Sequence, residues 1–393
     1  MRIRAFALAL ALVAVLLAGC GGSTGEDDAQ QSAPPTGPQT LPSGSAHPVA
    51  GDFKPSAKTL ADCKPGSEGL YACLEQAYGN LAYTKGPKLT LKRFAADMAA
   101  DSEVERDCHR IVHNIGSASL ARNKGDVGRT FAEGDSTCWS GYYHGILERA
   151  LKGATEDIVL KARVRALCKE VLATEPTFTA YQCVHGLGHG LMIRTGLDLP
   201  YSLKMCESLA TPWEQTSCDG GVFMENFNTS YGVQSRFLKD DQPLYPCTEV
   251  AERHKLYCYL QITDRVLQLN GYDFAAAGRT CLESEREWVA TCFQSYGRSA
   301  SGTSRLDQQK LLSLCGRAPA TGQPECVFGA VRDIASNDAG GKRAMAFCGA
   351  VRDPFRGRCF YGLGTILNDL GRLQECALVP SAYRPNCRLR AAS

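Results

Sequence analysis

Apolar residues recur at helical spacing through most of the chain beyond residue 57. Segments such as 306–314 and 328–335 carry them three or four positions apart, which places their side chains on one face of a helix. Alternating runs of β-branched residues, the pattern of strands, are nearly absent. Turn-forming residues such as Pro319 and Gly322 separate the helical segments. The pattern predicts an all-α fold in which helices pair as hairpins.

Two segments with a different pattern precede the helical part. Residues 5–17 form an unbroken apolar run behind Arg2 and Arg4, and this run is too short to cross a bilayer as a mature helix. Residues 21–55 are rich in Ser, Gly, Pro, Thr and Gln. Such a stretch cannot bury enough apolar surface to offset the entropy lost on ordering, so we expect a disordered, flexible tether.

The apolar run ends in Leu17-Ala18-Gly19-Cys20. This ending resembles the lipobox of bacterial lipoproteins, in which the signal peptide is removed and the Cys thiol is acylated. The resemblance implies an exported protein that a lipid on Cys20 anchors to a cell-envelope membrane. No other apolar stretch is long enough for a membrane span. The expected division is a signal peptide over 1–19, the lipidated Cys and a flexible linker over 20–56, and a folded domain over 57–393.

The charge of the chain gives no sign of a nucleic-acid partner. Once the signal peptide and its two Arg residues are removed, 41 basic residues stand against 41 acidic ones. We therefore expect neither nucleic-acid binding nor an electrostatic membrane contact. The sequence also lacks a Walker motif, CxxCH, HExxH and GxSxG, which mark nucleotide, haem, zinc-protease and serine-hydrolase sites.

Eighteen cysteines remain once Cys20 is set aside. An even number in an exported protein indicates a disulfide framework. The last five sequence-adjacent pairs are each separated by eleven positions, and their first members recur with a period near 34 over most of that part. A period of this size is typical of a repeat array. The pairs, read in order, are Cys63/Cys73, Cys108/Cys138, Cys168/Cys183, Cys206/Cys218, Cys247/Cys258, Cys281/Cys292, Cys315/Cys326, Cys348/Cys359 and Cys376/Cys387.

Each disulfide is expected to join the end of one helix to the start of the next across a short loop. Adjacent antiparallel helices can bring two Cα atoms within the ~7 Å that a disulfide needs. Cys108 and Cys138 are thirty residues apart, and Cys108 falls at the start of a helical segment, so the connectivity around them stays open. The array is expected to comprise a His-rich part over 97–230 and more regular repeats over 240–393.

The layout of residues 168–387 resembles that of the cysteine-rich Sel1-like (tetratricopeptide-related) repeat proteins, as in the segment Cys359-Phe-Tyr-Gly-Leu-Gly. In that family, consecutive helical hairpins are stapled by sequence-adjacent disulfides. The resemblance implies a disulfide-stapled, α-solenoid-like array. Solenoids of this kind commonly bind a partner on their concave face.

The position six residues after the second Cys of each pair forms a polar stripe, where a core would have Leu or Ala. We expect this stripe to line a concave surface or groove, although a solvated helix face is an equal alternative for its Asp, Arg and Thr end. Glycine recurs three residues after Cys, and close approach of neighbouring helices is the expected reason. The stripe consists of His144, His189, Met224, Asp264, Arg298, Arg332 and Thr365, and the glycines are Gly141, Gly186, Gly221, Gly329 and Gly362.

Five of the seven histidines fall between positions 109 and 189. His109 and His113 are four residues apart, as are His185 and His189, and on a helix this spacing puts two imidazoles on one face, where they can bind one metal ion. His144 is at the stripe position equivalent to His189. We expect the five side chains to converge on one metal-binding locus, with the first pair either joining it or forming a second site. The alternative is that the histidines pack between helices and hydrogen-bond to the backbone.

The identity of the metal is only partly constrained. Imidazole suits Zn, Cu, Fe or Ni, and the thioether of Met224 would favour copper if it ligates. Glu148 and Glu225 are candidates for a carboxylate partner, a ligand or a general base. One functional hypothesis is a metal-binding lipoprotein that handles copper or zinc, or is a metalloenzyme. The other is a surface-anchored helical-repeat module that binds a peptide or protein without metal.

Overall fold

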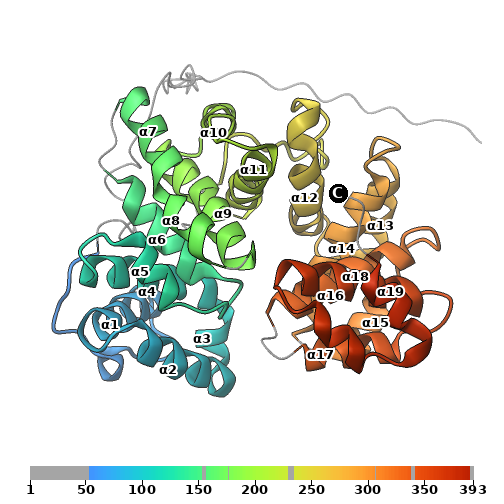
Figure 1. The fold of residues 1–393 in the computed structure, drawn as a ribbon, viewed down its shortest axis with the longest axis horizontal. Helices are drawn as coiled ribbons and strands as arrows, with labels where there is room; N and C mark the ends of the chain where they lie inside the picture. Colours follow the sequence, from blue (N-terminus) through green and yellow to red (C-terminus); the bar gives the residue numbers. More distant parts are fainter. Residues whose placement is uncertain are drawn as a thin grey trace, which may run out of the picture. The chain divides into compact units, whose positions relative to one another are not determined.

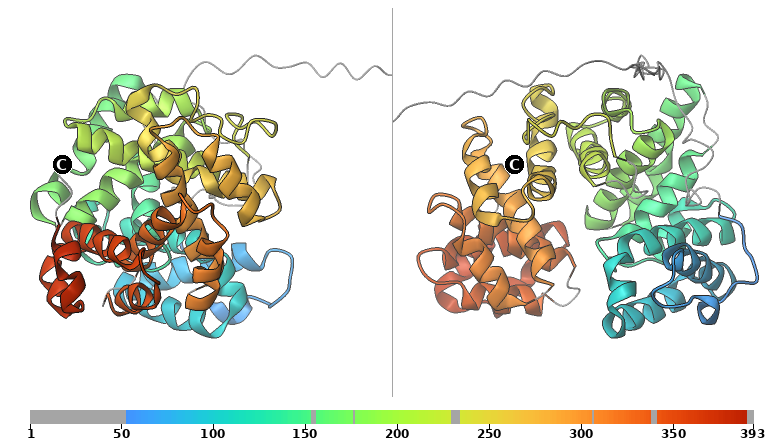
Figure 2. Two further views of the ribbon diagram at one scale, coloured as in Figure 1. Left: turned by 90° about the vertical axis from the view of Figure 1, so that its right-hand side faces the viewer. Right: turned by 180° about the vertical axis from the view of Figure 1, so that it is seen from behind.

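The computed structural model describes residues 53–152, 156–175, 177–228, 234–305, 307–337 and 341–389. Within these residues every regular element is a helix and no strand is present (Figure 1). The two further views in Figure 2 likewise contain only coiled ribbons and loops. The predicted all-α fold is confirmed. Cys20, the predicted signal peptide and most of the predicted linker lie outside the described residues.

The helices of the N-terminal half are α1 (Leu70–Lys85), α2 (Pro87–Ala100), α3 (Ser102–Arg106), α4 (Cys108–Arg122), α5 (Val127–Ala132), α6 (Gly141–Leu151), α7 (Asp157–Leu167), α8 (Lys169–Thr174), α9 (Thr177–Arg194), α10 (Leu199–Cys206) and α11 (Pro212–Phe227). The helices of the C-terminal half are α12 (Lys255–Leu269), α13 (Phe274–Leu282), α14 (Val289–Ser304), α15 (Gln308–Gly316), α16 (Gln323–Ser336), α17 (Lys342–Ala350), α18 (Arg356–Asp369) and α19 (Arg384–Arg388). Short 3-10 helices are η2 (Leu60–Asp62), η3 (Glu252–His254), η4 (Leu373–Leu378) and η5 (Ser381–Tyr383).

An inner row of helices packs in the order of the chain. Each member contacts the next, and the row consists of α1, α4, α6, α9, α11, α12, α14, α16, α18 and α19 (Figure 1). Outer helices, most of them shorter, each contact two successive members of this row, and they are α2, α5, α10, α13, α15 and α17. This alternation of inner and outer helices is the arrangement of an α-solenoid-like array, in which each unit packs mainly on its neighbours.

All nine predicted disulfides are present, including the pair Cys108–Cys138 that the spacing left open. Their Cα–Cα distances run from 5.4 to 6.0 Å. In the last five pairs the inner helix begins three residues before the second Cys. The sequence had predicted a helix start at that Cys itself. The expected geometry of helix end to helix start is wrong for Cys108–Cys138, since Cys108 is the first residue of α4 and Cys138 lies in the turn before α6. It is also wrong for Cys247–Cys258, since Cys247 lies in a turn outside any helix.

Aspartates begin four of the outer helices. The side chains of Asp126, Asp198, Asp273 and Asp307 each accept a hydrogen bond from a backbone N–H in the first turn of α5, α10, α13 and α15. Such a cap pairs one of the backbone donors that the start of a helix leaves without an intrahelical acceptor. The recurring Asp therefore stabilises the short outer helix of successive units.

Glycines allow some of the inner helices to pack closely. A Cβ on Gly221 would lie 1.9 Å from the carbonyl oxygen of His185, and a Cβ on Gly329 would lie 2.0 Å from that of Gln294. No side chain fits at such distances, so the predicted close approach is confirmed at these two positions. It is wrong at Gly186, where the nearest neighbour of an added Cβ is an ordinary contact at 3.4 Å.

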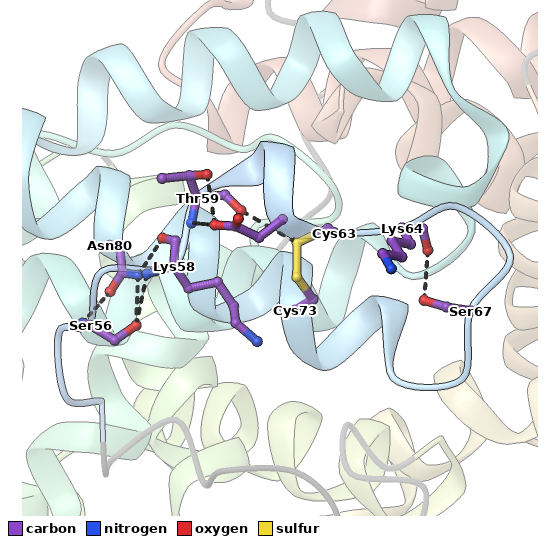
Figure 3. Close-up of a disulfide and its surroundings, with 9 residues drawn as sticks. Ser56, Lys58, Thr59, Cys63, Lys64, Ser67, Cys73 and Asn80 are labelled. Carbon is purple, nitrogen blue, oxygen red and sulfur yellow. Dashed lines mark hydrogen bonds between the residues drawn. A yellow bond between two sulfur atoms is a disulfide. The ribbon is translucent and has the colours of Figure 1, made fainter.

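The chain is packed against α1 from residue 53 onward. The side chain of Phe53 is buried and its ring lies 6.3 Å from that of Tyr83. Asn80 accepts a hydrogen bond from the backbone N–H of Ser56 at 2.9 Å and donates to the carbonyl oxygen of Lys58 at 2.7 Å. The disulfide Cys63–Cys73 closes the same segment onto α1, as Figure 3 shows.

The disulfide framework indicates the compartment of the folded protein. Disulfides in such number persist outside the reducing cytoplasm, so this is a protein of an oxidising, extracytoplasmic environment. Among the helices of the described residues, none combines the length and the apolar character that crossing a bilayer requires.

Candidate metal centre

Five histidines from three consecutive inner helices lie together. His109 and His113 are on α4, His144 is on α6, and His185 and His189 are on α9. The ring centroid of His144 lies 5.3 Å from those of both α4 histidines. It lies 5.2 Å from the ring of His185 and 4.1 Å from that of His189. The structure thus brings together all five histidines that the sequence singled out, with His144 in the middle.

Close packing at glycines positions the helices that carry these histidines. A Cβ on Gly145 of α6 would lie 1.8 Å from the carbonyl oxygen of His113, and Gly221 of α11 approaches the carbonyl oxygen of His185 in the same way. Interiors packed to this degree deform little. The backbones of His113 and His185 are therefore held at a fixed distance from the next helix in the row.

Within each pair on one helix, the two Nε2 atoms face each other. They are 3.1 Å apart in the pair His109 and His113, and 3.3 Å apart in the pair His185 and His189. Two nitrogens that bind one tetrahedral ion at ~2.0–2.1 Å are about 3.3 Å apart. Each pair therefore has nearly the spacing of two imidazole ligands on one ion.

The Nδ1 atoms of the same four histidines are engaged on the other side of each ring. Nδ1 of His113 lies 2.6 Å from Oε1 of Glu148, and Nδ1 of His189 lies 2.8 Å from Oε2 of Glu225. Nδ1 of His109 lies 3.0 Å from the carbonyl oxygen of Cys138. Nδ1 of His185 lies 3.2 Å from the hydroxyl of Tyr181. A carboxylate or carbonyl acceptor places the ring proton on Nδ1 and leaves the lone pair on Nε2, the usual arrangement around metal-binding histidines.

His144 differs from the other four histidines. Its side chain is almost fully buried, at 1% exposure. Neither of its ring nitrogens has a hydrogen-bond partner among the described residues. Its ring stacks on that of His189 with an angle of 16° between the planes. An unpaired buried polar group is costly, by about 1–3 kcal/mol each, so the alternative in which the histidines pack and hydrogen-bond to the backbone does not describe His144 among the described residues.

The five histidines form two overlapping groups. One consists of His109, His113 and His144 and the other of His144, His185 and His189, and in each group one potential ligand atom per residue lies within 4.8 Å of the others. The sequence predicted one shared locus with a second site as the alternative. The geometry favours two adjacent loci that have His144 in common.

The turn before α6 has an unusual backbone. Cys138, Trp139 and Ser140 have φ values of 50°, 52° and 62°, in the left-handed region that costs L-residues roughly 1–2 kcal/mol each. This turn is tied to α4 by the disulfide to Cys108, and it directs the carbonyl oxygen of Cys138 at the Nδ1 atom of His109. Backbone strain is commonly retained where the local geometry serves a site.

Burial decides the protonation of most of the centre. It lowers the pKa of His109, His144 and His185 well below the usual value, and neighbouring imidazoles lower it further. The pKa of His189 falls to about 3, mainly through burial. Burial also acts to lower the pKa of His113, but the charge of Glu148 and its hydrogen bond raise it more. Most of these imidazoles are thus neutral at neutral pH, which is the state that binds metals.

A cavity of about 260 Å³ adjoins the centre, and His144 and His185 are part of its wall. Asp333 also lines this cavity, and burial raises its pKa to about 6 although the charge of Arg298 lowers it. Aromatic residues of the wall are Trp139, Phe178, Tyr181, Trp213 and Tyr257, and charged ones are Arg298, Arg332, Asp333 and Asp369.

The polar stripe predicted from the sequence lines this cavity in part. Nη2 of Arg298 lies 3.4 Å from Oδ2 of Asp264, and Arg332 donates to the hydroxyl of Thr365 at 2.8 Å. The polar end of the stripe therefore forms contacts between successive inner helices. The stripe residues that line the cavity are His144, Met224, Arg298 and Arg332.

Three residues of the site, Tyr181, Tyr257 and Asp333, were not predicted from the sequence. Tyr181, whose hydroxyl faces His185, lies one helical turn before that histidine, so the four-residue spacing used for the histidine pairs could have found it. Tyr257 and Asp333 carry no such signal, because they belong to helices far along the chain that reach the cavity only through the fold.

Comparisons of the chain with protein-family profiles, with curated protein sequences and with solved structures gave no match. The resemblance to Sel1-like repeat proteins therefore stays a prediction from the cysteine layout.

Proposed function

We propose that this protein is an exported, membrane-anchored metalloprotein whose five-histidine centre binds copper or zinc. The observation that carries the proposal is the orientation of the paired histidines. Four rings have their Nδ1 atoms on protein partners and their Nε2 atoms turned toward each other at 3.1 and 3.3 Å. A merely structural packing of histidines does not require both features, whereas a metal site does.

The donor set also fits the chemistry of these metals. Imidazole nitrogens are good ligands for Cu and Zn, while Mg and Ca prefer oxygen. The eighteen paired cysteines are not available as thiolate ligands, which leaves the imidazole nitrogens as the candidate donors within the centre. Glu148 and Glu225 supply negative charge beside the centre and raise the basicity of the rings they contact.

The adjacent cavity favours a centre that exchanges its metal ion or catalyses a reaction, and not a purely structural centre. Structural zinc sites are closed by four protein ligands, whereas catalytic ones keep a position open to water or substrate. His144 and His185 belong to both the centre and the cavity wall. A metal ion held by them is accessible to a small molecule in the cavity, as metal handling or catalysis requires.

The membrane anchor of this proposal rests on the sequence. Leu17-Ala18-Gly19-Cys20 follows an apolar run, and the nine disulfides agree with export. Mass spectrometry of the mature N-terminus tests the anchor: we expect a lipid-modified Cys20, and an unmodified start at another residue contradicts it.

Elemental analysis tests the metal centre. The protein is exported so that its disulfides form, purified without a polyhistidine tag, and analysed both as isolated and after exposure of the metal-free form to Cu or Zn. We expect near-stoichiometric metal that is lost in the double variant His185→Gln/His189→Gln. The matched control is His254→Gln, which changes a buried histidine outside the centre and is expected to keep the metal. A folded wild-type protein that binds neither metal contradicts the proposal.

A further inference from the structure

His144 belongs to two groups of potential ligands, one with the histidines of α4 and one with those of α9. It lies on α6, which packs against α4 on one side and α9 on the other. The pair on α4 and the pair on α9 each complete a group of three potential ligands with it. Both of its nitrogens are buried without a hydrogen-bond partner among the described residues.

A single metal ion would leave one ring nitrogen of His144 without a partner. A metal-binding histidine normally donates its second ring N–H to a protein acceptor, as His113 does toward Glu148 and His189 toward Glu225. His144 has no such acceptor. If one nitrogen of His144 bound an ion, the other would stay buried and unpaired, at a cost of about 1–3 kcal/mol. Two ions satisfy both nitrogens.

We propose that the centre holds two metal ions and that His144 bridges them as an imidazolate. One ion is bound by His109, His113 and His144, and the other by His144, His185 and His189. This inference rests on the proposed function and adds the number of ions and their connection. Each ion has three nitrogen ligands, which leaves a coordination position open in a tetrahedral geometry.

The proton and charge balance of the bridge is favourable. Neutral His144 carries one ring proton, and binding of the second ion releases this proton as the imidazolate forms. Since His144 lies in the cavity wall, the proton can leave through the cavity. Two divalent ions bring four positive charges. The imidazolate and the carboxylates of Glu148 and Glu225 carry one negative charge each, so together they balance three of the four. Buried charges need such pairing.

Each half of the centre is built in the same way. A helix carries two histidines four residues apart, and the next inner helix supplies the carboxylate that holds the second histidine of the pair. Glu148 comes from α6 and holds His113 of α4, and Glu225 comes from α11 and holds His189 of α9. The repetition of the array therefore produces two equivalent half-sites, which α6 connects.

Copper titration followed by electron paramagnetic resonance tests the bridge. Metal-free wild-type protein, without a tag, is titrated with Cu(II), and bound copper is counted after removal of excess. We expect two copper ions per chain and a resonance signal that integrates to far less than two spins, because an imidazolate bridge couples the two unpaired electrons antiferromagnetically. The double variant His109→Gln/His113→Gln is expected to bind one copper ion with a full, uncoupled signal.

Two further variants complete the experiment. His144→Ala is expected to abolish the coupling and to lower the bound copper, while His254→Gln keeps two coupled ions. Two results overturn the bridge and leave the proposed metal function standing. One is wild-type protein that binds two uncoupled ions. The other is wild-type protein that binds a single ion, which is lost when either histidine pair is replaced. Folded wild-type protein that binds no copper and no zinc overturns both.

Discussion

Nδ1 of His189 lies 2.8 Å from Oε2 of Glu225, and both side chains are almost completely shielded from solvent. The histidine comes from α9 and the carboxylate from the following inner helix, α11. This contact orients the ring so that Nε2 faces the Nε2 atom of His185. The ligand geometry thus depends on the packing of two successive units of the array.

Replacement of this carboxylate is expected to weaken metal binding without removing a ligand. Glu225→Gln keeps the shape of the side chain but loses its charge, and changes of this kind typically cost about 10–100-fold in metal affinity. Competition of the protein with a chromogenic chelator measures the affinity. Glu285→Gln is the matched control, since Glu285 also accepts hydrogen bonds, from Lys255 and Tyr259, but lies outside the centre. Equal affinities of Glu225→Gln and wild type would show that the contact plays no part in metal binding.

The close approach of α9 and α11 is expected to depend on Gly221. A Cβ there meets the carbonyl oxygen of His185 at 1.9 Å, so Gly221→Ala forces the helices apart and is expected to cost about 1–3 kcal/mol. The control Gly302→Ala adds a Cβ in open space within α14 and is expected to gain about 0.5–1 kcal/mol from helix propensity. Denaturant unfolding of the oxidised proteins gives both values, and a Gly221→Ala protein as stable as wild type would refute the steric argument.

A buried histidine outside the centre, His254, is expected to make stability depend on pH. Nδ1 of His254 lies 2.7 Å from Oδ2 of Asp219, and its Nε2 lies 3.2 Å from Oε1 of Glu207. Burial acts to lower the pKa of His254, but the hydrogen bond and charge of Asp219, followed by those of Glu207, raise it above its usual value. The folded protein therefore keeps this proton at pH values where the unfolded chain has released it. The stabilisation is complete below about pH 6.5 and is lost as the pH rises through the folded-state pKa.

The variant His254→Gln is accordingly expected to lower the free energy of unfolding by about 2 kcal/mol near pH 6, as for a hydrogen bond to a charged group, and by less at alkaline pH. Urea unfolding at several pH values measures the difference. Thr263→Val removes hydrogen bonds to the hydroxyls of Ser295 and Ser299, which do not titrate in this range, so its effect should not change with pH. A loss in His254→Gln that is the same at all pH values would be evidence against a charged His254.

The sequence predicted the fold well because the cysteine spacing and the helical apolar spacing repeat together along the chain. The separation of eleven residues in the last five pairs, and the helical spacing between them, were enough for an all-α, disulfide-stapled array. The first residue of each inner helix was harder to predict from the sequence. Helix ends depend on caps and loop geometry, and in these five units the helix begins one turn before the Cys.

The sequence predicted the five histidines of the candidate centre, but it did not predict that they form two groups that share His144. Spacing of four along one helix is a local property, so the pairs His109/His113 and His185/His189 could be read directly. How far α4, α6 and α9 rotate against one another is a property of packing, and it places His144 between the pairs and leaves both its nitrogens unpaired. The cavity also joins residues such as Tyr181 and Asp333, which only the tertiary fold brings together.

Anomalous diffraction from crystals of the copper- or zinc-loaded protein shows whether the five histidines bind metal. Data collected at the absorption edge of the metal locate each ion independently of the protein density. We expect one anomalous peak within bonding distance of the Nε2 atoms of His185 and His189 and of a ring nitrogen of His144, and a second peak between His144 and the pair on α4. Metal-loaded crystals with no anomalous peak among the five imidazoles would contradict the proposed metal centre.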